Sequence, residues 1–367
     1  MRILLVGEYS GFYRNLGIGL MKNGHEITHI SNGDSWKNIF SIKTDCFPQN
    51  KNPFIRYINT LLKQKKCIKA LKHYDVVQIV NPTVFMSNFD KLIPFMKTRN
   101  YRLINILKSN NKSLFLSVAG HDYQVCKFYA TLPYHPLEND INTYKSFFRS
   151  TYKSNYEKVI NIVDGIIPVM YTYAESYRNH PKVLGTIQLP IDLDEYDAIN
   201  KFEYTNKIEI LHGINRPLEK GTKYILEALR IVEKKYPSLV NVTIADRLPF
   251  TEYIKLVQKS HIIIDQALTY DYGMNAIIAM SLGKIVLSGN EQECSYEFRQ
   301  SDIPIINILP SVEDIISKIE IVINNPNLML ELSNKSTLFV RRFHDAKLVS
   351  NIYIDNWVRR SSDMNAK

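Results

Sequence analysis

The chain has 367 residues, of which 45% are hydrophobic and 22% are charged. This length suits two α/β domains better than one core, and the balance excludes a disordered or low-complexity chain. The formal net charge of +10 is unevenly distributed, because residues 1–185 carry +13 and residues 186–367 carry −3. The basic first half favours a nucleic acid, an anionic membrane or a phosphorylated substrate as its partner. The alternative is a solvated, lysine-rich surface with no such partner.

Short apolar runs in the first half of the chain predict buried strands, and segments of helical period separate them. The predicted strands are residues 2–7, 25–31, 75–80, 113–119 and 165–169. The predicted helices are residues 11–23, 53–72, 88–110 and 139–163. This alternation is typical of a parallel sheet with helices on both faces.

The same pattern begins again in the second half. The predicted strands are residues 208–214, 240–246, 261–265, 284–289 and 304–309. Predicted helices lie between them at 221–236, 251–260, 273–283 and 291–300, and three more close the chain at 312–324, 327–343 and 345–360. The fold class is therefore α/β, with two doubly wound, Rossmann-like parallel sheets that we expect to face a cleft.

The predicted domains follow from this repeat. The first domain spans residues 1–187 and the second spans 208–344, and residues 188–207, rich in turn formers and acidic residues, form the linker. A C-terminal helix within 345–367 could pack back on the first domain. Ligands of open parallel sheets bind at the carboxyl ends of the strands, so residues that directly follow strands are the site candidates.

Two loops after strands are candidates in the first half. Gly7 and Gly11 flank a loop that ends a strand and opens a helix, which permits close backbone approach to an anionic ligand or is only a tight turn. His121 and Asp122 follow the strand 113–119, where they could orient a sugar hydroxyl or hold a proton, or could form a plain polar loop.

The most informative loop follows the first strand of the second half. It contains Gly213, Arg216 and Lys220 before a helix that begins near Gly221. Two cations beside a helix N-terminus can neutralise a diphosphate leaving group, with a surface loop bearing solvated cations as the alternative. A second loop leads through Gly273 into an almost wholly apolar helix, which must therefore be buried and whose N-terminus is another natural phosphate site.

These motifs resemble those of retaining glycosyltransferases with the GT-B fold, in the large glycogen-synthase-like family 4. The likeness extends over nearly the whole chain, through RILLVGEYSG, NGHEITHIS, HGINRPLEKGT and YGMNAIIAMSLGKIV. It is strongest to bacterial enzymes that assemble capsule and lipopolysaccharide. The resemblance implies a hexosyltransferase-like activity on a nucleoside-diphosphate sugar and a saccharide or lipid-linked acceptor, in surface polysaccharide biosynthesis.

The resemblance also implies residue roles. Arg216 and Lys220 match the cations that bind the donor diphosphate, and Tyr272, Gly273 and Met274 match the loop whose backbone amides bind the donor. The chemistry implied is metal-independent and uses no cofactor besides the donor. Gly11 and Gly213 are further candidates for donor contact, and His121 and Asp122 for the acceptor side.

The chain departs from the family at two glutamates eight positions apart, which contact the donor sugar and ribose. Their positions hold Tyr270 and Ile278. Asp271 could replace the first carboxylate, and Glu291 or Glu293 could reach the same region. Loss of the ribose partner should cost about 1–3 kcal/mol. The alternative function is therefore a catalytically degenerate protein that binds a partner or glycan, and a third is a nucleotide-sugar epimerase.

The remaining features concern location. The apolar run at residues 3–7 is too short for a signal peptide, so we expect a cytoplasmic protein with Cys46, Cys67, Cys126 and Cys294 reduced. Residues 52–73 predict an amphipathic helix with many lysines. Its apolar side, predicted as Phe54, Ile58, Leu61, Ile68 and Leu71, either packs on the core or lies on the inner face of an anionic membrane. We expect no nucleic-acid partner, because only the net charge favours one and the sequence contains no motif of the known nucleic-acid-binding modules.

Overall fold

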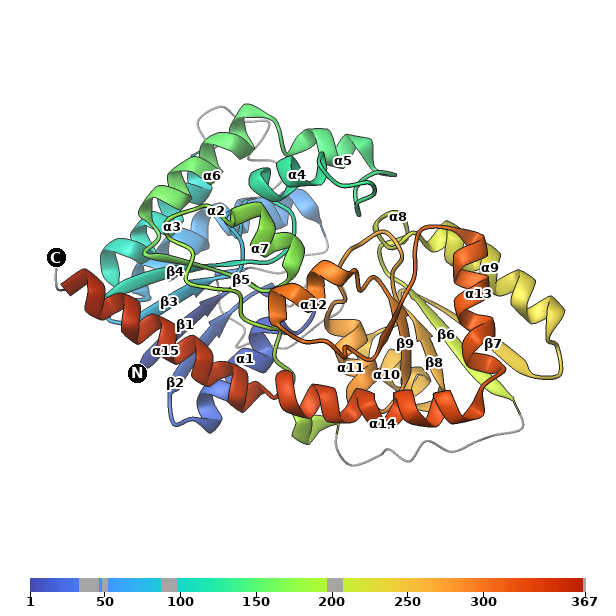
Figure 1. Ribbon diagram of the computed structural model, residues 1–367. Coiled ribbons are helices and arrows are strands. Elements are labelled where there is room, and N and C mark those ends of the chain that lie inside the picture. The colour runs from blue at the N-terminus through green and yellow to red at the C-terminus, as the bar shows by residue number, and fades with distance from the viewer. Residues whose placement is uncertain (33–45, 48–51, 87–97, 197–206, 366–367) are drawn as a thin grey trace. The chain divides into compact units, whose positions relative to one another are not determined.

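The computed structural model describes residues 1–32, 46–47, 52–86, 98–196 and 207–365 (Figure 1). The chain divides into two compact units. Unit 1 comprises Met1–Ala130, Tyr144–Pro190 and Ala346–Lys367, and unit 2 comprises Thr131–Thr143 and Ile191–Asp345. Each unit therefore includes a segment from the other half of the sequence.

Unit 1 contains a five-stranded parallel sheet in the order β2-β1-β3-β4-β5. Its strands are β1 (Arg2–Val6), β2 (Glu26–Ile30), β3 (Val76–Ile79), β4 (Ser113–Val118) and β5 (Gly165–Pro168). Its helices are α1 (Phe12–Lys22), α2 (Pro53–Ala70), α3 (Arg99–Asn110), α4 (Tyr123–Tyr129), α6 (Ser150–Ile162), α7 (Tyr171–Tyr177) and α15 (Ala346–Asn365), and α5 (Ile141–Ser146) lies at the boundary between the units.

Unit 2 contains a second five-stranded parallel sheet, in the order β10-β9-β8-β6-β7. Its strands are β6 (Ile208–Ile214), β7 (Val240–Asp246), β8 (Ile262–Ile264), β9 (Ile285–Ser288) and β10 (Ile305–Asn307). Its helices are α8 (Pro217–Lys220), α9 (Thr222–Lys235), α10 (Phe250–Lys259), α11 (Met274–Ser281), α12 (Gln292–Phe298), α13 (Val312–Ile323) and α14 (Pro326–Phe343), with a short 3₁₀ turn, η4, at Leu193–Glu195. Both sheets thus have one connectivity, in which the strand order reverses beside the first strand.

The structure confirms two parallel sheets with flanking helices, which is the predicted two-domain α/β class. The single helix predicted over 139–163 is instead divided into α5 and α6, because the amides of Phe147 and Phe148 make tight turns with the carbonyls three residues earlier. Three short helices, α4, α7 and α8, follow strands and were not predicted. Predictions for residues 88–97 and 197–206 lie outside the described part of the chain.

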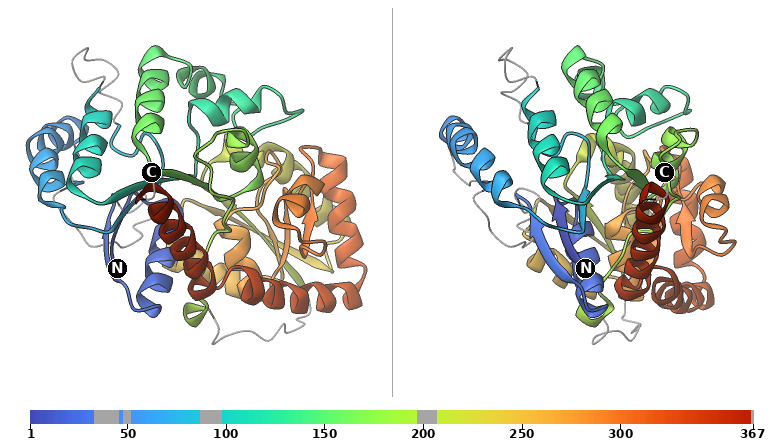
Figure 2. Two further views of the ribbon diagram at one scale, coloured as in Figure 1. Left: turned by 60° about the vertical axis from the view of Figure 1, so that its left-hand side comes forward. Right: turned by 90° about the vertical axis from the view of Figure 1, so that its left-hand side faces the viewer.

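The last helix, α15, packs against α1 in unit 1 (Figure 2). A side chain at Gly19 of α1 would lie 2.0 Å from the Ala346 carbonyl oxygen, so glycine is required for this close approach. Trp357 is fully buried and its indole Nε1 donates to Gln78 Oε1 at 2.9 Å. Gln78 Nε2 in turn donates to the buried Ser117 hydroxyl, so a polar network fixes the end of the chain to β3 and β4.

The apolar helix α11 is buried in unit 2, as its sequence predicted. Ala276, Ile277, Ala279 and Met280 have no exposed surface. Helices α9 and α13 cover a core that β6, β8 and β9 share.

The cysteines differ from the sequence prediction. Cys46 and Cys67 are joined by a disulfide with a Cα–Cα distance of 5.4 Å, whereas four reduced thiols were expected. The sequence could not show this pairing, because 21 positions separate the two residues and only the fold brings them together. Cys126 and Cys294 are free and buried.

We expect Trp357→Phe to lower the free energy of unfolding by about 2–4 kcal/mol, because the substitution leaves a cavity and removes the donor to buried Gln78. Urea denaturation of the full chain would measure this change. Val358→Ala is the matched control, because Val358 is next to Trp357 in the sequence and its own side chain is 51% exposed. The loss of stability in this variant should stay within about 0.5 kcal/mol. Equal losses in both variants would contradict the anchoring role of Trp357.

Candidate functional site

The carboxyl ends of β6 and β8 form the point at which the strand order of unit 2 reverses. In open parallel sheets a ligand crevice opens at this position. β6 ends at Ile214 and leads into α8, and β8 ends directly before Asp265. The loop with the predicted cations and the end of a central strand therefore meet at the place where the fold favours a ligand.

Lys220 is almost completely buried here, with 4% of its side chain exposed. Its Nζ donates to Asp265 Oδ1 at 2.7 Å and to the Gly213 carbonyl at 3.1 Å. Asn275 Nδ2, from α11, donates to the same carboxylate oxygen at 2.8 Å. Burial alone would raise the pKa of Asp265, but the charge and hydrogen bond of Lys220 outweigh burial and lower it. This ionised pair joins the ends of β6, β8 and α11.

Arg216 lies at the surface instead, with half of its side chain exposed. Its guanidinium donates to Glu219 Oε2 at 3.0 Å, three residues further along the chain. Ion pairs of this exposed kind are weak, so Arg216 can exchange Glu219 for an anionic ligand at little cost. The structure therefore separates the two predicted cations into an accessible arginine and an internally paired lysine.

The side chains of the second predicted loop turn inward. Asp271 is 2% exposed and accepts a hydrogen bond from the Cys294 thiol at 3.3 Å, while the buried Tyr272 hydroxyl lies 3.3 Å from His344 Nε2. The loop offers a ligand mainly its backbone, since α11 begins at Met274 with Gly273 as N-cap. The first amides of a helix have no acceptor within the helix, which suits an anion.

The two positions of the missing glutamates differ in their surroundings. Ile278 is 5% exposed on α11 and provides no hydrogen-bonding group. Tyr270 lies with its ring 5.0 Å from the ring of Tyr134, and its carbonyl accepts from the Glu291 amide at 3.0 Å. Glu291 thus lies beside the first position, and Glu293 in the first turn of α12 is close enough for its charge to act on Tyr270 as well.

Glu291 and Tyr134 form a contact that the sequence did not reveal. The Tyr134 hydroxyl donates to Glu291 Oε1 at 2.5 Å, and Asn307 Nδ2 donates to the same oxygen at 3.0 Å. Tyr134 belongs to Thr131–Thr143, which groups with unit 2 although it lies in the first half of the sequence. No local pattern around Tyr134 signals this distant docking.

Asn215 adds a further polar group to the β6 loop. Its Oδ1 is buried and lacks a hydrogen-bond donor among the residues that the structure describes. Buried acceptors usually have a partner, so this atom suits a ligand hydroxyl or an ordered water. The sequence carries no signal for Asn215, because only the fold buries its amide oxygen.

The corresponding loop of unit 1 is a tight turn. Gly7 has φ +95°, and a Cβ there would lie 2.4 Å from a Val80 side-chain carbon, so only glycine fits. Glu8 is 2% exposed and accepts from the Arg14 amide at 2.8 Å, which caps α1. Gly11 has φ +88° and is the residue before α1. The Glu8 carboxylate thus accepts a hydrogen bond from an amide at the N-terminus of α1, where the sequence predicted an anionic ligand.

His121 and Asp122 are neighbours in sequence but differ in burial and in their hydrogen-bond partners. Asp122 is fully buried, accepts from the Val125 amide at 2.8 Å as the N-cap of α4, and accepts from the Tyr177 hydroxyl at 2.6 Å. His121 is partly exposed, with Nδ1 3.0 Å from the Tyr129 hydroxyl. Of the predicted pair, only His121 is placed where a substrate could reach it.

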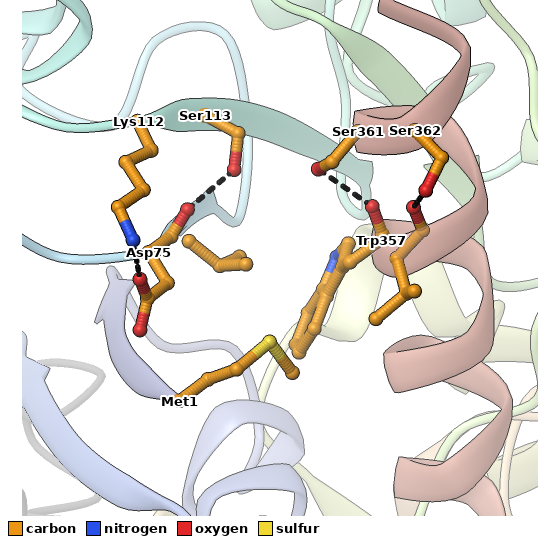
Figure 3. Close-up of a pocket in the computed structure, with 9 residues that line it drawn as sticks. Met1, Asp75, Lys112, Ser113, Trp357, Ser361 and Ser362 are labelled. Carbon is orange, nitrogen blue, oxygen red and sulfur yellow. Dashed lines mark hydrogen bonds and ion pairs between the residues drawn. The ribbon is translucent and has the colours of Figure 1, made fainter. Parts of the chain in front are cut away.

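A separate pocket of about 710 Å³ lies in unit 1 at the amino ends of β1, β3 and β4, beside the last turns of α15 (Figure 3). Its polar groups are paired with one another or with backbone: Lys112 with Asp75, the Ser113 hydroxyl with the Asp75 carbonyl, and the Ser361 hydroxyl with the Trp357 carbonyl. It lies at the end of the sheet opposite the predicted site residues and is not part of the candidate site.

Metal ligation and membrane crossing are two further possibilities for the described residues. Among them, no group of three or more His, Cys, Asp or Glu side chains is arranged to hold a metal ion. No helix in the same part of the chain has the length and apolarity needed to cross a bilayer.

Comparison with solved structures shows what this fold is similar to. Sucrose-phosphate synthase from Thermosynechococcus elongatus matches with a TM-score of 0.63 and 13% identity over 100% of both chains. The Anabaena protein HepE in complex with UDP and glucose matches at 0.62 and 10%, over 98% of this chain and 100% of its own. The UDP-GlcNAc 2-epimerase from Neisseria meningitidis, bound to UDP-GlcNAc, matches at 0.57 and 15%, over 98% and 100%. At these identities the likeness establishes the two-domain fold.

Comparisons at the level of sequence give no match. No protein-family model matches the chain, and no curated protein matches it significantly.

We expect Asp265→Ala to lower the free energy of unfolding by about 3–5 kcal/mol, because it leaves the Lys220 charge buried without its partner. The double variant Lys220→Met/Asp265→Leu should recover most of that loss, since it removes both charges and keeps apolar volume. Chemical denaturation would compare the variants, with Glu233→Ala, at an exposed position of α9, as the control. If the double variant is no more stable than the single one, the buried charge is not the cause.

Asp122 should make stability depend on pH. Burial raises its pKa to about 6, so the folded chain binds this proton more tightly than the unfolded chain. The resulting stabilisation is complete below about pH 4 and is lost as the pH rises through about 6, an effect of about 3 kcal/mol. Denaturation of wild type and Asp122→Asn at pH 4 to 7 should show the variant gaining relative to wild type as pH rises. Parallel profiles would contradict this assignment.

Proposed function

We propose that the protein is a glycosyltransferase that takes a sugar from a nucleoside-diphosphate donor bound on unit 2. One observation carries this proposal. Arg216, the Lys220–Asp265 pair and the N-terminus of α11 all lie at the carboxyl ends of β6 and β8, where the strand order of the sheet reverses. The folds of sucrose-phosphate synthase and of HepE, solved with UDP and glucose, support the same class.

The proposed chemistry assigns different tasks to the two cations. Arg216 and the amides at Gly273 and Met274 would stabilise the leaving diphosphate as its negative charge develops. Lys220 would hold the loop in place, because Asp265 already balances its charge. Gly213 lets that loop lie close to Tyr253, and the buried Asn215 acceptor suits a hydroxyl of the donor.

The finer features of the proposal come from the family resemblance. Transfer would proceed with retention and without a metal, since cationic side chains and amides supply the positive charge, and the leaving phosphate would accept the acceptor's proton. The acceptor, a saccharide or lipid-linked saccharide of a surface polysaccharide, would use the basic unit 1 near Gly11 and His121. The protein would act in the cytoplasm, peripherally on the inner face of the membrane.

Two further functions have specific support. Ile278 gives no partner for a ribose hydroxyl and Asp271 is engaged by Cys294, which favours a degenerate protein that binds a partner or glycan. The similarity to the UDP-GlcNAc 2-epimerase favours a nucleotide-sugar epimerase. The epimerase predicts turnover of a donor with no acceptor present, whereas the degenerate protein predicts no turnover.

Calorimetric titration with UDP, GDP and UDP-sugars tests the proposal. We expect one diphosphate series to bind and Arg216→Ala to weaken that binding about 10- to 100-fold, the loss typical of a charged hydrogen bond. Arg230→Ala is the matched control, because Arg230 is an exposed arginine on the neighbouring helix α9.

Lys220 is not a useful probe of ligand binding, since its removal leaves Asp265 unpaired in the interior. Absence of binding by the wild-type protein to every nucleotide would overturn the donor site and favour the degenerate protein. Equal losses in Arg216→Ala and Arg230→Ala would instead assign binding to general charge.

A further inference from the structure

Helix α2 has an exposed face that the proposed donor site does not explain. Along this face lie Ile55, Ile58 and Leu62, whose side chains are 47%, 39% and 73% exposed. Their spacing of three and four residues places them in one stripe. Three large aliphatic side chains in water on one helix form a surface that favours a partner.

The opposite face of α2 holds the helix on unit 1. Tyr57, Gln64 and Ile68 are buried, and Gln64 Nε2 donates to the Cys46 carbonyl at 2.7 Å while its Oε1 accepts from Arg99 of α3. The predicted apolar side was therefore wrong in part, because Ile58 and Ile68 lie on different faces. In Figure 2, α2 lies at the outer edge of unit 1 beside α3.

The charge of α2 indicates what covers this face. Lys65, Lys66 and Lys69 are exposed and continue the stripe of Ile55, Ile58 and Leu62 toward the C-terminal end. The helix contains five basic residues and no acidic one. Its outer face is thus aliphatic in its first half and cationic in its second, an arrangement suited to insertion among lipid chains with the ammonium groups at the headgroups.

We propose that this face of α2 docks the protein on a bilayer containing anionic lipids. A nucleic acid would satisfy the lysines but would leave the aliphatic stripe in water. Among the α2 side chains that the structure describes, no aromatic ring is exposed for base stacking. A bilayer satisfies both halves of the face. Docking on a bilayer would bring a lipid-linked acceptor within reach of the proposed glycosyltransferase. Only this statement about the acceptor rests on the proposed function, and the docking itself does not.

Co-sedimentation of the full chain with vesicles tests the proposal. Wild type should bind vesicles of phosphatidylcholine with about one-third phosphatidylglycerol, bind phosphatidylcholine alone weakly, and lose affinity as salt is raised. Leu62→Glu should weaken binding at least about tenfold. Lys65→Glu/Lys66→Glu/Lys69→Glu should weaken it by about a hundredfold or more, at about fivefold per cation lost.

The matched control is Arg102→Glu/Lys127→Glu/Lys145→Glu, which makes the same change in net charge at exposed positions elsewhere in the basic half of the chain. This control should bind vesicles nearly as well as wild type. Equal loss in both triple variants, or wild-type binding by Leu62→Glu, would overturn the assignment to α2. Binding to single-stranded RNA but not to vesicles would also overturn it, in favour of a nucleic-acid surface.

UDP titration of the same variants keeps the two proposals distinct. Unchanged UDP binding by the α2 variants shows that they are folded and attributes their loss to the membrane surface. If no nucleotide binds wild type but vesicle binding depends on α2, the docking surface stands and the donor site fails.

Discussion

The buried ion pair between Lys220 and Asp265 is the interaction on which the candidate site depends. It connects the loop after β6, the end of β8 and, through Asn275, the first turn of α11. Two charges taken from water at this position are stable only because each satisfies the other and the Gly213 carbonyl accepts a further hydrogen bond. The pair therefore fixes the relative positions of the three backbone segments that a ligand at the strand reversal would touch.

This constraint decides where positive charge is available. A lysine neutralised by a carboxylate contributes little net field to a ligand, so attraction for a diphosphate must come from Arg216 and from helix amides. Arg216 is suited to that task because half of its side chain is exposed and its ion pair with Glu219 lies at the surface. The division between a structural cation and an accessible one is what distinguishes this loop from a surface loop with two solvated cations.

The sequence predicted the architecture well because buried parallel strands are continuous apolar runs, as in LLV of β1 and III of β8, and glycines mark the turns that follow them. It predicted the location of candidate loops for the same reason. It could not predict their internal contacts: Asp265 appeared as the end of a strand, and only the fold brings it to Lys220, 45 positions away. Asp122 shows the opposite case, since an acid beside a histidine suggested chemistry, but burial and an N-cap give it a structural role.

The two sheets share one strand order, yet their reversal points are filled differently. In unit 1, Glu8 turns into its own loop to cap α1, and burial lowers the pKa of the neighbouring His29 to about 4, which keeps that ring neutral. In unit 2 the loop after β6 holds an arginine at the surface, and the loop after β8 leads into α11, whose N-cap Gly273 has no side chain to cap the helix. A loop that satisfies its own helix N-terminus has less to offer an anion than one that leaves amides open. Common connectivity therefore does not imply common function, and the side chains of the two loops differ in a way that favours the proposed placement of an anionic donor on unit 2.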